Sequence, residues 1–534
     1  MDQFYMTTIS VSVLLISIIW YIKSLLKPGG KTPPLPPGPR GLPILGYLPF
    51  LGKNLLHQFT DLGHKYGPIY KLYLGNKLYV VISSPSLVKE VVRDHDAVFA
   101  NRDSPVAALV GTYGANDIAW SPHNSQWRAM RKIFVQEMMN NRNLKESYSL
   151  RKDEVRKTIR HVHTKVGMPI GIGELSFQTE LNVIRNMLWG GIIEGEEGKR
   201  IGAEFRVLIS KIVDLFGKPN ISDFYPVLAG LDIQGLKKQM ENYMQSMDNI
   251  FNAVIAQHKQ KLSGGVKKEG NKDFVQILLE LQGKQDSEVS ISDGQIKAIL
   301  MDVIVGGTDT TATTVEWAMA ELMNNPDVMA KAQKELSDVV GLNNIVEELH
   351  IPNLKYLEAV IKETLRLHPA IPLLVPRICA GMPLAERMLI YLLSSLLHSF
   401  DWKLAEGEIV DMSETFVIVL RKSTPLFALP NPRLHDSNLY LAPRYAAAMQ
   451  PKKPSFDPLS SDKALQVGSD VIVQKVVELA HSPPRANSTI PGSSNQFVIL
   501  DEMYSRMVEL NENKESMEKG ISGVESGMML EDMV

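Results

Sequence analysis

An acid and several alcohols interrupt the most apolar helical stretch of this chain. Residues 296–318 are almost continuously apolar, but they contain the run GGTDTT at positions 306–311. Two glycines and a cluster of hydroxyls in a buried helix are expected to loosen its hydrogen-bond ladder and open a groove. Asp309 beside Thr310 could then pass protons into that groove. The alternative is a strained core helix whose hydroxyls bond carbonyls of their own preceding turn.

The only cysteine, Cys379, lies in the run RICAG at positions 377–381, ahead of the helical segment LAERMLIYLLSSLLHSF. The dipole of the following helix and the nearby Arg377 would stabilise a thiolate there. A buried structural thiol is the alternative. One cysteine excludes an intramolecular disulfide and any multi-cysteine zinc or iron–sulfur site, and it favours a reducing compartment.

Two side-chain pairs are spaced to share a helix face. Glu363 and Arg366 lie in YLEAVIKETLRLHP, a helix that Pro369 should close, and they can form an ion pair. Trp127 and Arg131 are four residues apart and could offer an indole N–H and a guanidinium to one anion. For each pair the alternative is structural: a surface ion pair, or an amphipathic helix with one aromatic in the core.

The elements that must position these residues are mainly helical. Residues 69–82 give two short β-rich runs around Gly75-Asn76, which predicts a hairpin. Apolar residues at helical spacing predict helices over 87–98, 125–139, 200–216, 236–261, 291–323 and 328–339. The fold class is therefore mostly α with a minor β sheet. In 534 residues the net charge is only −2, so no nucleic-acid partner is expected.

The amino terminus predicts a membrane anchor. No charged side chain occurs from Gln3 to Ile22, and at about 1.5 Å per residue this run can cross a bilayer core of about 30 Å. The lysines follow the run, which places the body in the cytoplasm and argues against the alternative, a cleaved signal peptide. We assign residues 1–26 to the anchor and 27–46, rich in proline, to a stiff hinge that orients the body on the membrane.

Taken in chain order, these motifs resemble those of the cytochrome P-450 haem-thiolate monooxygenases of plant microsomes. The order is anchor, PPGPRGLPILG hinge, W-x-x-x-R, G-G-x-D-T-T, E-x-x-R and R-x-C-x-G. Plant enzymes that hydroxylate terpenoids or flavonoids are the most similar, and SFDWKL and IVLRKSTPLFALPNPRL resemble their carboxy-terminal sheet region. The resemblance covers residues 1 to about 434, with the monooxygenase domain at 47–434.

The resemblance implies a cofactor, partners and roles for individual residues. Cys379 would ligate the iron of haem b, flanked by Arg377 and Gly381, while Trp127 and Arg131 would hold a haem propionate. Asp309 and Thr310 would deliver protons, and Glu363 and Arg366 would be structural. The implied partners are O2, a small hydrophobic substrate and an NADPH-dependent flavoprotein reductase, at the endoplasmic reticulum membrane with a single-pass anchor and the catalytic body cytosolic. The implied substrate pocket is lined by Gly306, Ala370, Leu374, Val375, Phe416 and Val417.

The chain departs from the family pattern just before the cysteine. Family members have several tens of residues between the E-x-x-R helix and the cysteine, including an arginine-bearing meander and a phenylalanine-glycine loop. Here the expected phenylalanine is Pro372 and the expected glycine is Val375, so two family segments are joined near Arg377. The five residues from Leu374 to Cys379 span at most about 17 Å, which barely reaches around a haem.

Residues 435–534 form an unassigned tail outside the family pattern. It contains two possible helices, at 465–480 and 500–510, and we expect it to be partly disordered. The leading hypothesis is a membrane-anchored monooxygenase. The alternatives are a catalytically inactive splice or gene-model variant, or a binding protein, without stable haem, and a scaffold that acts through the tail.

Overall fold

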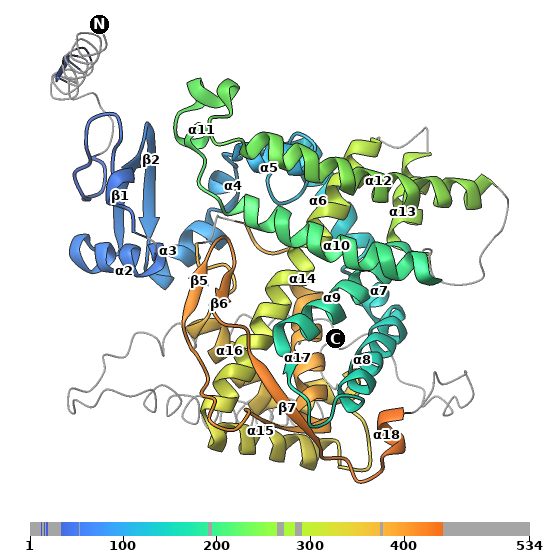
Figure 1. The fold of residues 1–534 in the computed structure, drawn as a ribbon. Helices are drawn as coiled ribbons and strands as arrows, with labels where there is room; N and C mark the ends of the chain where they lie inside the picture. The colour runs from blue at the N-terminus through green and yellow to red at the C-terminus, as the bar shows by residue number, and fades with distance from the viewer. Residues whose placement is uncertain are drawn as a thin grey trace, which may run out of the picture.

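The computed structural model describes residues 34–52, 54–190, 195–263, 272–283, 291–373 and 377–441, together with Ser12, Leu15, Ile18 and Ile19. These residues form a mainly helical body with small sheets, so the predicted fold class is confirmed (Figure 1). Most of the predicted anchor and the tail beyond residue 441 lie outside the described residues. Within the described part of the chain, no helix is both long and apolar enough to cross a membrane.

The predicted hairpin is confirmed. Strand β1 (Ile69–Leu74) pairs with β2 (Lys77–Ile82) in antiparallel register, with Ile69 opposite Ile82. Gly75 turns the chain at a φ of 59°, a left-handed conformation that glycine adopts without a steric penalty. Helix α2 (Leu55–Tyr66) packs on β1, and the Tyr70 hydroxyl donates to the Phe59 carbonyl at 2.8 Å.

Helix α14 (Asp293–Asn324) runs through the middle of the body (Figure 1). It begins in a capping box, because the Ser292 hydroxyl accepts from the Gln295 N–H and the Gln295 side chain accepts from the Ser292 N–H. Its longest helix contact is with α9 (Ile172–Trp189). A Cβ at Gly307 would lie 2.1 Å from Cδ1 of Ile184, so the glycine is what allows the two helices to approach this closely.

The other long helices surround this pair and agree with most of the predicted ranges. They are α6 (Ser125–Glu137), α8 (Tyr148–His163), α10 (Gly195–Phe216), α12 (Leu236–Ser263), α13 (Phe274–Gln282), α15 (Pro326–Val339), α16 (Lys355–Leu367) and α17 (Met382–Ser399). Short helices α5 (Val106–Gly111), α7 (Asn141–Glu146), α11 (Ile221–Phe224) and α18 (Asn438–Leu441), with the 3-10 turns η1 (Leu48–Phe50), η3 (Pro226–Leu231) and η4 (Glu348–Asn353), complete the helical part.

The prediction of one continuous helix over residues 87–98 is wrong. Residues 87–98 form α3 (Pro85–Lys89), a π-helical turn η2 (Glu90–Asp94) and α4 (Asp96–Phe99) instead of one helix. None of these three elements has a buried residue. Without a buried apolar face, helical spacing alone does not hold a long helix together.

The carboxy-terminal strands close the body beside α14. Strand β7 (Phe427–Pro432) pairs antiparallel with both β4 (Phe400–Lys403) and β3 (Ile170–Gly171), and β4 follows α17 directly. A separate hairpin consists of β5 (Glu414–Phe416) and β6 (Leu420–Lys422), and β6 contacts α14. The core therefore lies around α14, between the helical layer and these strands.

Glu180 on α9 is a buried acid with an unpaired carboxylate oxygen. It is 2% exposed, and its Oε1 finds no hydrogen-bond partner among the described residues. Burial raises the pKa of Glu180 to about 8. The carboxyl is therefore mostly neutral at pH 7, and its ionisation costs folding free energy.

Glu180→Gln should remove one pH dependence of stability. The folded-state pKa lies above the usual 4.5, so the folded chain of the parent protein should lose stability as pH rises from about 4.5 to about 8. Above that range the variant should be more stable by up to about 5 kcal/mol, from about 1.4 kcal/mol for each unit of the raised pKa. The urea midpoint measured across this pH range for both proteins checks this, and parallel profiles would contradict it.

Candidate active site

The middle of α14 has one open face. Gly306 is exposed, and a Cβ placed on it would meet nothing within 4 Å. Thr310 follows one turn later and is half-buried, with its hydroxyl donating to the Gly306 carbonyl at 2.8 Å. Asp302 lies one turn before Gly306 on the same stripe of the helix. A small molecule could approach the backbone most closely at Gly306.

The hydroxyls of this segment bond the helix itself. Thr308 donates to the Ile304 carbonyl and Thr314 to the Thr310 carbonyl, each at 2.8 Å. Helix α14 continues unbroken across these residues. The expected loosening of the hydrogen-bond ladder is therefore absent, because Gly307 packs closely on α9 and the hydroxyls add bonds to the preceding turn.

Asp309 lies against β6. Its Oδ2 accepts from Arg421 at 2.7 Å, and Arg421 also contacts Asp214 of α10 at 3.3 Å. The two carboxylates raise the pKa of Arg421 although burial lowers it. Asp309 is therefore an ion-paired carboxylate that ties α14 to the β5–β6 hairpin.

The described pocket residues gather around the same hairpin. The Leu420 N–H donates to the Ala370 carbonyl at 2.9 Å, and Phe416 pairs with Leu420 across the hairpin. A Cβ on Gly217 would lie 2.3 Å from Cγ1 of Val417, so this tip packs on the end of α10. Leu374 and Val375, which the sequence placed in the same pocket, lie outside the described residues.

Arg377 lies beside Trp127 and Arg131, although about 250 residues separate it from them in the chain. The Arg377 guanidinium lies 4.5 Å from the centre of the Trp127 ring, and that of Arg131 lies 5.6 Å from it. Arg131 also donates to the Ile378 carbonyl at 2.8 Å. The helix α6 thus holds the segment that carries Cys379.

Arg377 is held by backbone carbonyls that the sequence motifs did not point to. Its Nε donates to Ala100 at 2.9 Å, one terminal nitrogen donates to Ile118 at 2.8 Å and to Ala119 at 3.2 Å, and the other donates to Ser121. Burial is the main cause that lowers the pKa of Arg377 to about 10. Carbonyl acceptors leave no side-chain signature, so only the folded backbone reveals this site.

Cys379 is exposed and precedes α17, as its position in the sequence predicts. A Cβ on Gly381 would lie 3.9 Å from its sulfur, so a larger residue there would touch the thiol. Burial lowers the pKa of Arg131, and the neighbouring Cys379 opposes that shift. The thiol and the arginine are therefore electrostatic neighbours.

The pair of Glu363 and Arg366 forms as the spacing predicts. Arg366 donates to both carboxylate oxygens at 2.7 Å. The Glu363 side chain is fully buried, whereas the Arg366 side chain is 52% exposed. The arginine therefore keeps hydrogen-bonding capacity toward solvent.

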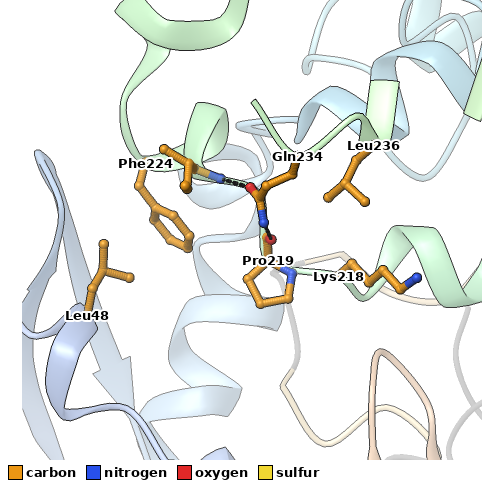
Figure 2. A pocket seen from close by; sticks show the side chains of 7 residues that line it. Leu48, Lys218, Pro219, Phe224, Gln234 and Leu236 are labelled. Atoms are coloured by element: carbon orange, nitrogen blue, oxygen red, sulfur yellow. Dashed lines mark hydrogen bonds between the residues drawn. The ribbon is translucent and has the colours of Figure 1, made fainter. Parts of the chain in front are cut away.

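A hollow of about 430 Å³ lies apart from these residues (Figure 2). It is lined by residues of η1, of α11, of the segment before α11 and of the residues around the start of α12: Leu48, Lys218, Pro219, Ile221, Phe224, Gln234 and Leu236. Gln234 bridges it by accepting from the Ile221 N–H at 2.6 Å and donating to the Pro219 carbonyl at 3.1 Å. Its lining contains no pair of acid and base suited to chemistry.

Arg421→Met should destabilise the fold by leaving Asp309 without its partner. The Asp309 side chain is 10% exposed, so its charge would be poorly solvated; because the arginine itself is 30% exposed, we expect a loss of about 1–3 kcal/mol. Chemical unfolding measures this. Arg421→Met combined with Asp309→Asn should regain part of the loss, and equal losses in the single and double variants would contradict the ion-pair explanation.

Known proteins resemble the chain over most of its length. The cytochrome P-450 family model matches residues 36–378 and, in a second part, 376–429. Cytochrome P-450 76C2 of Arabidopsis thaliana is 31% identical over 493 positions, covering 78% of this chain and 96% of the relative. A flavonoid 3'-monooxygenase of Oryza sativa subsp. japonica (31%; 80% of this chain, 97% of the relative) and carnosic acid synthase of Salvia pomifera (31%; 79% and 98%) are also similar.

A solved structure supports the same assignment at the level of the fold. A zebrafish cytochrome P-450 with abiraterone aligns with a TM-score of 0.62 at 19% identity, covering 72% of this chain and all of that one. The family model accounts for more than half of the chain, and relatives above 30% identity are covered almost completely. The chain belongs to the cytochrome P-450 family of monooxygenases.

Proposed function

We propose that this chain is a membrane-anchored monooxygenase that hydroxylates a small hydrophobic plant metabolite, a terpenoid or a flavonoid. It would use O2 and electrons from an NADPH-dependent flavoprotein reductase. The observation that supports this most directly is the convergence of Trp127, Arg131 and Arg377 beside Cys379. The similar flavonoid 3'-monooxygenase and carnosic acid synthase support the substrate class.

The proposed roles follow the residues that carry the resemblance. The family uses haem b ligated by a cysteine, and in this chain Cys379 is the candidate ligand, with Arg377, Gly381, Trp127 and Arg131 around the cofactor. Thr310, on the open face of α14, and the ion-paired Asp309 are the candidate proton carriers. Gly306, Ala370, Phe416 and Val417 are the described candidates for the substrate pocket.

The hydrogen bonding of Arg377 and Trp127 fits a bound haem poorly, because most of their donors are already used inside the chain. Arg377 uses all three guanidinium nitrogens on backbone carbonyls, and the single N–H of Trp127 donates to the Ile118 carbonyl at 2.9 Å. Trp127 has no N–H left for a propionate, and Arg377 has one left of its five N–H donors. The candidate axial thiol is exposed, whereas a supported thiolate needs an enclosing loop. A haem-free variant or binding protein is therefore the second candidate function.

We infer that the misfit arises from a family segment missing near residue 377. The family model matches in two parts that meet at residues 376–378. The 493 aligned positions to the Arabidopsis relative also exceed 78% of a 534-residue chain, so that relative has residues that this chain lacks. The half-exposed Arg366 is where an additional partner would fit.

Restoring a family-like strand, meander and cysteine loop at Arg377 should restore haem binding. The restored loop would enclose Cys379 and draw Arg377 away from its carbonyls. The measurement is haem content with the reduced, carbon-monoxide-bound difference spectrum, for this chain and the restored chain side by side.

Only the restored chain should give a thiolate-shifted band, and Cys379→Ser in it should remove that band. Equal haem content in both chains would contradict the inference that a missing segment prevents haem binding. A restored chain that binds no haem would contradict the role of Cys379.

The membrane assignment rests on two features. One is the uncharged run at residues 3–22, and the other is a set of exposed apolar side chains in and after η3. Val227 and Leu231 of η3 are 94% and 69% exposed, and Ile233 is 56% exposed. The Tyr225 hydroxyl donates to the Ile44 carbonyl at 3.1 Å, so this surface lies next to the end of the proline-rich hinge. Exposed apolar side chains of this kind are suited to contact with lipid.

In sealed microsomes, added protease should digest the body of the chain. The lysines after the uncharged run place the body on the cytoplasmic side. Immunoblotting with and without detergent distinguishes the two orientations. A body that is protected until detergent is added would contradict the proposed orientation.

A further inference from the structure

Two carboxyl groups meet between α14 and the segment of residues 117–121. Asp117 is 1% exposed, and Asp302 projects from α14 one turn before Gly306. Both carboxyls accept from N–H groups of this one segment, and the neighbouring Asp117 adds to the burial that raises the pKa of Asp302. An ionised carboxylate only accepts hydrogen bonds, so a bond between these carboxyls would require that one of them keep its proton.

The pair is also the anchor of the segment's backbone. Oδ2 of Asp302 accepts from the N–H of Ile118 at 2.6 Å and of Ala119 at 3.2 Å. Both oxygens of Asp117 accept from the Trp120 N–H at 3.1 Å. The N–H groups of the segment therefore point to the acids, while its carbonyls point to the arginines.

We propose that Asp117 and Asp302 share one proton and act as positioning residues for Arg377. The pair fastens residues 117–121 to α14, and the carbonyls of Ile118, Ala119 and Ser121 then hold the Arg377 guanidinium. Arg102 bonds the Ala119 carbonyl as well, at 2.9 Å. Without the shared proton, both carboxyls would be negatively charged. Their mutual repulsion would release the segment from α14.

Burial and the repulsion between the two carboxylates favour a retained proton, and the surrounding cations oppose it. Burial is the largest cause that raises the pKa of both acids, and for Asp302 the neighbouring Asp117 adds to it. The opposing groups are the backbone N–H donors and the two nearest cations, Arg102 and Arg377, with Arg131 behind Arg377. Burial lowers the pKa of Arg102 and of Arg377 to about 10, so both stay charged at pH 7 and do not themselves titrate in the range of the acids.

The direction of the pH effect follows from the raised pKa. The folded state binds the shared proton more tightly than the unfolded chain does, so the pair's contribution is complete below the ordinary aspartate pKa. It declines as pH rises through the raised pKa of the folded pair. The segment should therefore be most firmly held in acid and loosest in alkali.

Asp117→Asn tests the shared proton directly, because an amide can always donate to the Asp302 carboxylate. Hydrogen exchange of residues 117–121 is measured in the full chain between about pH 5 and about pH 9, as protection relative to the intrinsic rate. In the parent protein, protection of the Ile118 and Ala119 N–H groups should fall at least about tenfold across this range. In Asp117→Asn it should stay constant, and in Asp117→Ala it should be low throughout.

Two further measurements separate positioning from general stability. Trypsin cleavage after Arg377, compared between variants at one alkaline pH, should be faster in the parent protein than in Asp117→Asn. Glu180→Gln is the matched control, because it removes a different buried acid and should leave the exchange profile of residues 117–121 unchanged.

Equal pH profiles in the parent protein and Asp117→Asn, or a profile that Glu180→Gln also flattens, would overturn the proposal.

The positioning of Arg377 matters to the proposed monooxygenase because Arg377 lies two residues before Cys379. The test reads only the polypeptide, so its failure would leave the haem assignment standing, and a failure to bind haem would leave this proposal standing.

Discussion

The burial of α14 is the constraint on which the rest of the structure depends. The helix packs along α9 and also contacts α15, α16, α17 and β6, so its side chains are enclosed on nearly every face. Each fully buried large apolar side chain contributes roughly 1.5–3 kcal/mol, and Trp317, Ile299 and Met319 are among them. Gly307 permits this packing, and Gly306 leaves the one face that stays open.

The polar groups of α14 turn that packing into a defined arrangement of segments. Asp302 fastens residues 117–121, Asp309 fastens the β5–β6 hairpin through Arg421, and Glu316 accepts from the Leu426 N–H at 2.9 Å. Each acid bonds a segment far away in the chain. Buried carboxylates without such partners would be costly, so these bonds select one register for the segments around the helix.

The arginines around Trp127 show how a binding site can be closed by its own backbone. Guanidinium donors suit a planar anion, but in this chain four of the five N–H donors of Arg377 go to the carbonyls of Ala100, Ile118, Ala119 and Ser121. Buried donors must be satisfied by some acceptor, and carbonyls are always available. The residues that are typical of a cofactor site can therefore be present while their hydrogen-bond donors are used inside the protein.

The sequence by itself determined the helical fold class, the hairpin around Gly75, most helix ranges and the pair of Glu363 and Arg366. These follow from local periodicity, from turn chemistry and from spacings within one or two turns. It also marked Trp127, Arg131 and Cys379 as belonging to one site, through motif order. Only the tertiary structure decided that residues 87–98 break into short helices, that the hydroxyls of α14 bond their own helix, and that Asp117 meets Asp302. Those outcomes depend on which backbone groups and buried faces long-range packing brings together, and no local pattern records them.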